Sequence, residues 1–171
     1  MEHTAILGLS MNSRMLGLAI ISGNRLVDHH IQLRKEPWTP RKRELILASL
    51  QPWLERYSIK HIAVSIPYEK QTSSQTKELL ASCTDHFSKK KIRLSSYPAK
   101  ALHVLCEEAK AKKEIMRTLA EKYPELSFYY HKEMRNKNKY YVKLFEAVGV
   151  ATIHTEKWKA KNKSAFKTGL E

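Results

Sequence analysis

Cysteine, acidic side chains and long apolar runs are all scarce in this sequence. Its 171 residues include two cysteines, Cys83 and Cys106, and neither belongs to a CxxC pair. The spacing of cysteine and histidine also fits no zinc site. We therefore expect two buried thiols, and a disulfide between them is allowed but not suggested by the sequence.

No apolar stretch of the chain approaches the length that a membrane-spanning helix needs, which is about 20 residues. The first residues also lack the basic segment followed by an apolar one that marks a secretory signal. A basic amphipathic helix with exposed aromatic residues, which would suit a membrane surface, is not evident. We expect a cytoplasmic protein without a membrane partner.

Positive charge is abundant where negative charge is scarce. The chain has 31 Lys and Arg against 17 Asp and Glu, which gives a net charge of +14. This balance favours a polyanionic partner, above all nucleic acid, although lysines that only maintain solubility would give the same total. The basic residues form three clusters, at Arg34, Lys35, Arg41, Lys42 and Arg43, at Lys89, Lys90, Lys91 and Arg93, and at Lys132, Arg135, Lys137, Lys139 and Lys143.

The first 33 residues predict three strands joined by two tight turns. Residues 5–9, 15–21 and 26–33 are mostly apolar and of strand length, and small polar residues of turn type separate them. Such spacing is typical of an antiparallel meander. The uninterrupted apolar character of residues 5–9 predicts a strand that is buried on both faces in the middle of a sheet.

The rest of the chain alternates helical and strand patterns, and Pro52 should kink or split the first helix. The predicted elements are a helix at 41–57, a strand at 61–67, a helix from 72–74 to 87, a strand at 91–97, helices at 98–106 and 110–123, an irregular stretch at 126–138, and a last helix from about 138. This order predicts an α/β fold with a mixed sheet of about five strands and flanking helices. We divide the chain into one domain, residues 1–156, and a frayed basic tail, residues 157–171.

The first hairpin also resembles a known family. The run Ile6-Leu7-Gly8-Leu9-Ser10, followed by Asn12-Ser13-Arg14, Gly17 and Ala19-Ile20-Ile21, is similar to the opening hairpin of RuvC-type Holliday-junction resolvases. The resemblance implies a ribonuclease-H-like fold. It also implies a catalytic centre in which carboxylates hold two divalent metal ions against the scissile phosphate.

The positions that the resemblance assigns to those carboxylates are mostly not acidic here. They fall on Ser10, Ser65, Lys143 and Glu146, so only Glu146 keeps a carboxylate. Hydroxyl groups and an ammonium are poor substitutes for the anionic oxygens that hard cations need. We therefore expect no intact catalytic residue, no bound metal and no cofactor. Lys143 can instead contact a phosphate with Glu146 beside it, or the two form an ordinary solvated pair.

Three interpretations of the function remain open. The first is a catalytically degenerate RuvC-like protein that binds structured DNA or RNA, and the residues assigned to binding are Asn12, Arg14, Lys89, Lys90, Lys91, Arg135, Lys137, Lys139 and Lys143. The second is a Mg- or Mn-dependent endonuclease for branched nucleic acid with a rearranged site, for example at Asp28, Glu69 and Glu146. The third is a protein-interaction scaffold. A homodimer follows only by analogy with the resolvases.

Aromatic and histidine residues carry weaker indications. Phe128-Tyr129-Tyr130 and Tyr140-Tyr141 lie beside lysines, so they either stack on bases or anchor a helix to the core. His29 and His30 should point to opposite faces of their strand, because side chains alternate along a strand, and they are not expected to share one metal ion.

Overall fold

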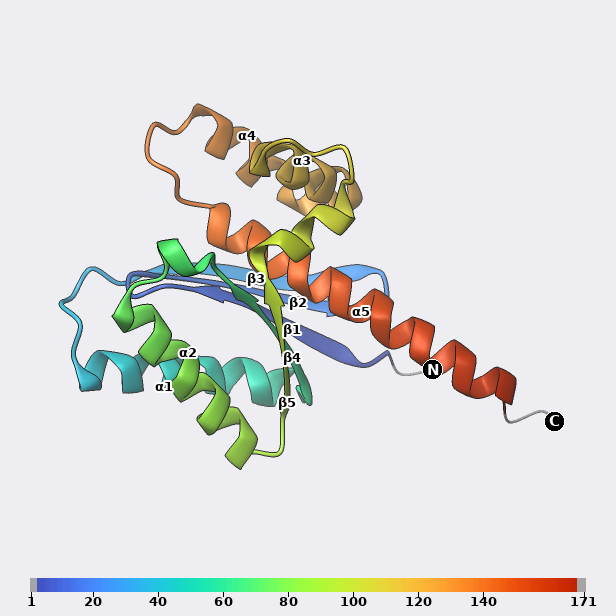
Figure 1. The fold of residues 1–171 in the computed structure, drawn as a ribbon, viewed down its shortest axis with the longest axis horizontal. Helices are drawn as coiled ribbons and strands as arrows, with labels where there is room; N and C mark the ends of the chain where they lie inside the picture. The colour runs from blue at the N-terminus through green and yellow to red at the C-terminus, as the bar shows by residue number, and fades with distance from the viewer. Residues whose placement is uncertain (1–2, 169–171) are drawn as a thin grey trace.

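A computed structural model of the chain describes residues 3–168. The elements follow one another as the strands β1 (Ala5–Met11), β2 (Met15–Ser22) and β3 (Arg25–Leu33), helix α1 (Pro40–Arg56), strand β4 (His61–Ile66), the 3₁₀ helix η1 (Glu69–Gln71), helix α2 (Ser74–Lys89), strand β5 (Arg93–Pro98), the 3₁₀ helix η2 (Ala99–Leu105), helix α3 (Lys112–Lys122), the 3₁₀ helix η3 (Pro124–Leu126), and helices α4 (Ser127–Arg135) and α5 (Val142–Thr168) (Figure 1).

The five strands form one mixed sheet in the order β3-β2-β1-β4-β5. The first three strands pair antiparallel, as the meander predicted, and β4 and β5 add in parallel. Strand β1 is therefore central, which confirms the prediction from its uninterrupted apolar run. The parallel pairs require crossover connections, and α1 and α2 supply them.

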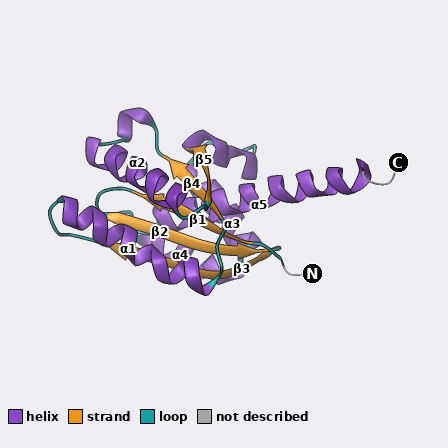
Figure 2. Cartoon of the chain, turned by 90° about the horizontal axis from the view of Figure 1, so that it is seen from below, coloured by secondary structure: helices purple, strands orange, loops and turns teal. Residues whose placement is uncertain are grey.

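Helices cover both faces of the sheet and enclose two hydrophobic cores. Helices α1 and α2 lie on one face, and α5 crosses the other with α3 and α4 packed outside it (Figures 1 and 2). Side chains of β1 alternate between the cores, with Ile6 facing α5 and Leu7 and Leu9 facing α1 and α2. Cys83 lies on the buried side of α2 with a free thiol, whereas Cys106 is half-buried. Only one of the two thiols is therefore buried as expected.

Two glycines of the sheet set the position of α5. A Cβ atom at Gly8 would overlap the backbone carbonyl of Ala147, and one at Gly17 would overlap the backbone of Lys143. The helix therefore lies against the strands more closely than any side chain would allow. This close approach fixes the first turns of α5 above the ends of β1 and β2.

The segment before α5 is more regular than its polar sequence indicated. Residues 127–135 form α4, and α5 begins at Val142 rather than near Asn138. The buried carboxylate of Glu133 accepts hydrogen bonds from the backbone N–H groups of Tyr140 and Tyr141 at 2.9–3.1 Å. These bonds order the connection between α4 and α5, and the irregular stretch predicted at 126–138 was wrong for residues 127–135.

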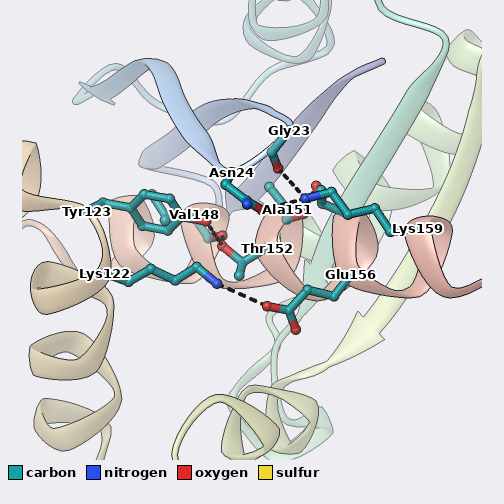
Figure 3. Close-up of polar contacts among 10 residues, drawn as sticks. Gly23, Asn24, Lys122, Tyr123, Val148, Ala151, Thr152, Glu156 and Lys159 are labelled. Carbon is teal, nitrogen blue, oxygen red and sulfur yellow. Dashed lines mark hydrogen bonds and ion pairs between the residues drawn. The ribbon is translucent and has the colours of Figure 1, made fainter. Parts of the chain in front are cut away.

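Within the tail predicted at 157–171, residues 157–168 are helical rather than frayed, because α5 continues to Thr168; residues 169–171 lie outside the described residues. The Lys159 ammonium donates to the carbonyl of Gly23 at 3.0 Å and to the side chain of Asn24, and Lys122 pairs with Glu156 at 3.0 Å (Figure 3). These contacts hold the second half of α5 against the β2–β3 turn and α3. The last turns extend beyond the sheet (Figure 2).

Two prolines bear on the predicted helices. Pro52 lies within α1 and does not split it, because α1 continues as one helix from Pro40 to Arg56. Pro98 precedes a 3₁₀ helix rather than an α-helix. Within residues 3–168, no helix combines the length and the apolar character that crossing a membrane requires.

Candidate functional site

The sheet brings Ser10 and Ser65 together. They are register partners in the parallel pair β1–β4, each close to the carboxyl end of its strand. Both residues are 1% exposed, and the hydroxyl of Ser65 has no hydrogen-bond partner among the described residues. The convergence that the sequence predicted for these two positions is confirmed.

The first turns of α5 complete the same site. Ser10 pairs with Gly17 on β2, and Gly17 lies directly beneath the backbone of Lys143. The Lys143 ammonium is 3.2 Å from a carboxylate oxygen of Glu146, which is itself 3% exposed. The ion pair expected at this helical spacing is therefore formed, but it is mostly buried rather than solvated.

A second cation, Lys112, reaches the same carboxylate. Its ammonium lies 3.8 Å from the Glu146 oxygen that Lys143 contacts. Lys112 is the first residue of α3 and is separated from Glu146 by 34 positions, so no local pattern in the sequence indicated this contact. Lys143 and Lys112 together surround the one remaining carboxylate with positive charge.

This arrangement does not fit a pair of divalent metal ions. The four assigned positions supply two hydroxyl groups, one ammonium and one carboxylate, and the carboxylate is engaged by two ammonium groups. Divalent metal ions at such centres require several anionic oxygens. Within residues 3–168, no group of three or more His, Cys, Asp or Glu side chains is placed to hold a metal ion.

The alternative metal trio is not assembled either. Asp28 accepts a hydrogen bond from the hydroxyl of Tyr57, which follows α1, so it faces the α1 side of the sheet. Glu146 lies on α5, on the opposite face. The residues that a rearranged site would need are therefore separated by the sheet.

Two of the predicted phosphate donors lie in the turn between β1 and β2. The side-chain oxygen of Asn12 accepts hydrogen bonds from the N–H groups of Arg14 and Met15, at 2.9 and 2.8 Å. Asn12 therefore shapes the turn with its oxygen, as asparagine commonly does. The side chain of Arg14 is exposed at the same end of the sheet as Ser10.

The third basic cluster leads directly into the site. Arg135 ends α4, and Lys137 and Lys139 lie in the connection to α5, a few residues before Lys143. All three side chains are exposed. The ammonium of Lys139 also donates to the carbonyl of Glu133, at 3.3 Å.

Lys89, Lys90 and Lys91, which were predicted from the sequence to bind nucleic acid, lie away from this site. They lie at the end of α2 and in the turn before β5, where residue 61 of β4 pairs with residue 93. Ser65 pairs with Tyr97, four positions along, at the other end of these parallel strands. The second basic cluster and the first site therefore lie at opposite ends of β4 and β5, too far apart for one side chain to reach from one to the other (Figure 1).

The aromatic residues near the site serve mostly as anchors. Tyr141 is buried, and Tyr129 packs against both Tyr141 and His29. Phe128 is the exception, because 65% of it is exposed. His30 packs against Trp53 of α1, so the two histidines face opposite sides of the sheet as predicted.

No protein-family model matches this sequence, and a search of the curated proteins finds no match. Solved structures are similar in fold. The chain superposes on Thermus thermophilus RuvC in complex with a Holliday-junction substrate with a TM-score of 0.68 and 15% identity, covering 93% of this chain and 96% of that one. A second Thermus thermophilus RuvC structure gives 0.65 and 13%, covering 86% and 90%.

The resolvase of Fowlpox virus, solved in complex with Holliday-junction DNA, is also similar. It gives a TM-score of 0.55 at 9% identity and covers 89% of this chain and 99% of that one. The chain therefore has the RuvC-like form of the ribonuclease-H-like fold, over nearly its whole length.

Proposed function

We propose that this protein binds structured DNA or RNA through a RuvC-like domain whose catalytic centre is degenerate. One observation carries the proposal: Lys143, Glu146 and Lys112 form an ion cluster where the fold would otherwise gather metal-binding carboxylates. The site has lost the charge that attracts a metal ion and has gained the charge that attracts a phosphate.

The chemistry of the cluster favours a phosphate ligand. An ammonium carries three N–H donors, and Lys143 gives one of them to Glu146, so others remain for a phosphate oxygen. The Lys112 side chain is 46% exposed and borders the same carboxylate. The hydroxyl of Ser65 has no partner among the described residues, but it is buried, so we do not count it as a phosphate donor.

Exposed cations around the cluster extend it into a binding surface. Arg14 lies on the turn after β1, and Arg135, Lys137 and Lys139 lie on the segment that enters α5. Contacts from such side chains to phosphates supply most of the affinity of a protein for nucleic acid. The neighbours bound to Holliday junctions support a branched substrate as the first one to test.

The test removes the central cation without leaving its partner unpaired. We expect Lys143→Gln combined with Glu146→Gln to weaken binding to a labelled four-way junction and to lower the slope of log affinity against log salt by about one, as the loss of one phosphate contact predicts. Fluorescence anisotropy across a salt series measures both quantities.

The matched control is Lys77→Gln, on the exposed side of α2 and therefore across the sheet from α5. A thermal melt of each variant verifies the fold. If the double variant binds the junction as tightly as the control and with the same salt slope, Lys143 does not contact a phosphate. If wild-type protein does not bind junctions at low salt, the nucleic-acid function itself is wrong and a protein-interaction scaffold becomes the better interpretation.

A further inference from the structure

A second basic surface lies at the opposite end of the parallel strands. A groove of about 590 Å³ opens there between the starts of β4 and β5 and the second half of α5. Its lining includes four cations, Lys60, Lys90, Lys91 and Arg93, together with His61 and Trp158. No acidic side chain from the described residues lines it. The site described above uses none of these residues.

Helix α5 adds a stripe of matching chemistry to this groove. His154, Lys157, Trp158 and Lys161 follow the spacing i, i+3, i+4 and i+7, which places them on one side of the helix. The Lys157 ammonium is 5.0 Å from the ring centre of Tyr97 on β5, so this side of the helix faces the sheet edge. Lys159 points away from it, toward the β2–β3 turn (Figure 3).

Two histidines lie where the helix meets the strands. The rings of His61 and His154 are 6.0 Å apart, and Nδ1 of His154 is 2.8 Å from the hydroxyl of Tyr97. The other ring nitrogen of His154 is buried without a partner among the described residues.

The pKa values of both histidines are lowered, first by burial and then by neighbouring positive charges. Burial lowers the pKa of His154, and the charges of His61, Lys157 and Lys161 lower it further. Burial also lowers the pKa of His61, with Arg93 and Lys60 acting in the same direction. Cations from β4, β5 and α5 therefore act on one small region, and an anion bound there would relieve their repulsion.

We infer that this groove is a second nucleic-acid surface, which takes a single-stranded segment with its phosphates on Lys60, Lys91, Arg93 and Lys157 and a base stacked on Trp158. A positive groove bordered by an aromatic ring is the arrangement by which proteins hold unpaired strands, since every base has a face that can stack. A continuous duplex offers phosphates but no free base face to Trp158.

The inference rests on the proposed function, and it adds a second binding site for nucleic acid. His61 and Ser65 mark the two ends of β4 and are four residues apart, which is about 13 Å along a strand. The two surfaces lie at opposite ends of the parallel strands of one sheet. One molecule would then hold a structured segment at the Lys143 end and an unpaired segment at the Trp158 end.

Binding of a labelled oligothymidylate tests the second surface. We expect Lys91→Glu with Arg93→Glu to weaken binding strongly and to flatten its salt dependence. Trp158→Ala should weaken binding by about 5-fold or more, the effect of losing one base–aromatic stack. The control is Lys70→Glu with Lys77→Glu, which makes the same change of charge on exposed residues of η1 and α2. Equal losses in both charge-reversal variants would overturn the inference.

A capture experiment separates the two surfaces. Wild-type protein bound to an immobilised four-way junction should retain labelled oligothymidylate, and the Lys91→Glu, Arg93→Glu variant should bind the junction but retain no oligothymidylate. The Lys143→Gln, Glu146→Gln variant should bind the oligothymidylate normally and the junction weakly. If the junction-bound Lys91→Glu, Arg93→Glu variant still retains oligothymidylate, two copies of the first site must hold the junction and the oligothymidylate, and the inference would be wrong.

The remaining outcomes also decide between the two proposals. If the protein ignores junctions but binds oligothymidylate through Trp158, the proposed function fails and the second surface stands. If oligothymidylate binding is unaffected by all the variants, whereas the Lys91, Arg93 variant alone loses affinity for phosphatidylserine vesicles, the groove binds a lipid surface and the inference is overturned.

Discussion

At the residue scale, the most informative position is Glu146. Of the four positions that the resemblance assigns to metal-binding carboxylates, Glu146 alone is acidic, and two ammonium groups contact it. A carboxylate held in this way is satisfied by its neighbours and does not need a metal ion. Its retention beside Lys143 is therefore consistent with a structural ion pair that orients the lysine.

This charge balance predicts the response of the site to magnesium. We expect isothermal titration calorimetry to detect no tight magnesium binding by the wild-type protein. The changes Ser10→Asp, Ser65→Glu and Lys143→Asp should create measurable affinity, because they return anionic oxygens to adjacent strand ends and the first turn of α5. Metal-dependent cleavage of a junction by wild-type protein, abolished by Glu146→Gln, would contradict the degenerate centre and favour an active endonuclease.

A second prediction at this scale concerns His154 and pH. The pKa of His154 is lowered in the folded protein, by burial first and then by His61, Lys157 and Lys161, so the unfolded chain takes up a proton first as the pH falls. The free energy of unfolding should therefore decrease as the pH drops below the ordinary value of 6.5.

Urea unfolding at about pH 7.5 and about pH 5.5, on either side of the ordinary histidine range, measures this decrease. His154→Gln keeps a side chain that can accept a hydrogen bond from Tyr97 but cannot titrate, so it should lose less stability between the two pH values than wild type does. His61 contributes in the same direction and remains in both proteins. Identical losses in wild type and variant would exclude His154 as the source.

At the scale of elements, the packing of α5 on the sheet organises the molecule. The helix begins over Gly17, passes Gly8, contacts the β2–β3 turn through Lys159 and continues to Thr168. It therefore contributes to both basic ends of the sheet. Its placement depends on two glycines whose missing side chains let the backbones meet.

Gly17→Ala should lift the first turn of α5 and disturb the Lys143 site. The added methyl group would overlap the backbone of Lys143, which cannot rotate away, so we expect a loss of about 1–3 kcal/mol or more in the free energy of unfolding. Gly149→Ala is the control. Its added methyl group would lie 2.6 Å from a methyl carbon of Leu102, and a leucine side chain can move aside. Urea unfolding should show the larger loss at Gly17; equal losses would mean that the close approach does not constrain the helix.

The elements also show where local sequence is a poor guide. The strands, α1 and α2 lie within a few residues of their predicted bounds, and Ser73 caps α2 as expected. Helix α4 and the second half of α5 were missed because both are polar in sequence. Contacts outside each helix stabilise them. Glu133 of α4 binds the backbone of Tyr141 at the start of α5, and Lys159 of α5 binds the β2–β3 turn.

At the scale of the whole molecule, the chain has a net charge of +14, and exposed cations lie at both ends of the parallel strands. Affinity for nucleic acid should fall steeply and linearly in a plot of log affinity against log salt, because each phosphate contact releases counterions. Between about 50 and 200 mM salt we expect a loss of at least about tenfold for a junction, measured by anisotropy. Affinity that does not change with salt would show that the charge is incidental to binding.

The sequence by itself determined the order of the elements and the central place of β1. These features follow from local rules, since side-chain alternation, turn residues and caps act within a few positions. The resemblance, and not a local rule, predicted that Ser10 and Ser65 converge, and the pairing of β1 with β4 brings them together.

Only the tertiary structure decided which charges meet. It placed Lys112 against Glu146, moved Lys89, Lys90 and Lys91 to the far end of the sheet, and set His154 beside His61. The physical reason is that these contacts join residues far apart in the chain, and their geometry depends on the order of the strands and on how closely α5 packs on glycine. No local pattern contains that information, so the division of one basic protein into two separate charged surfaces becomes visible only in the folded chain.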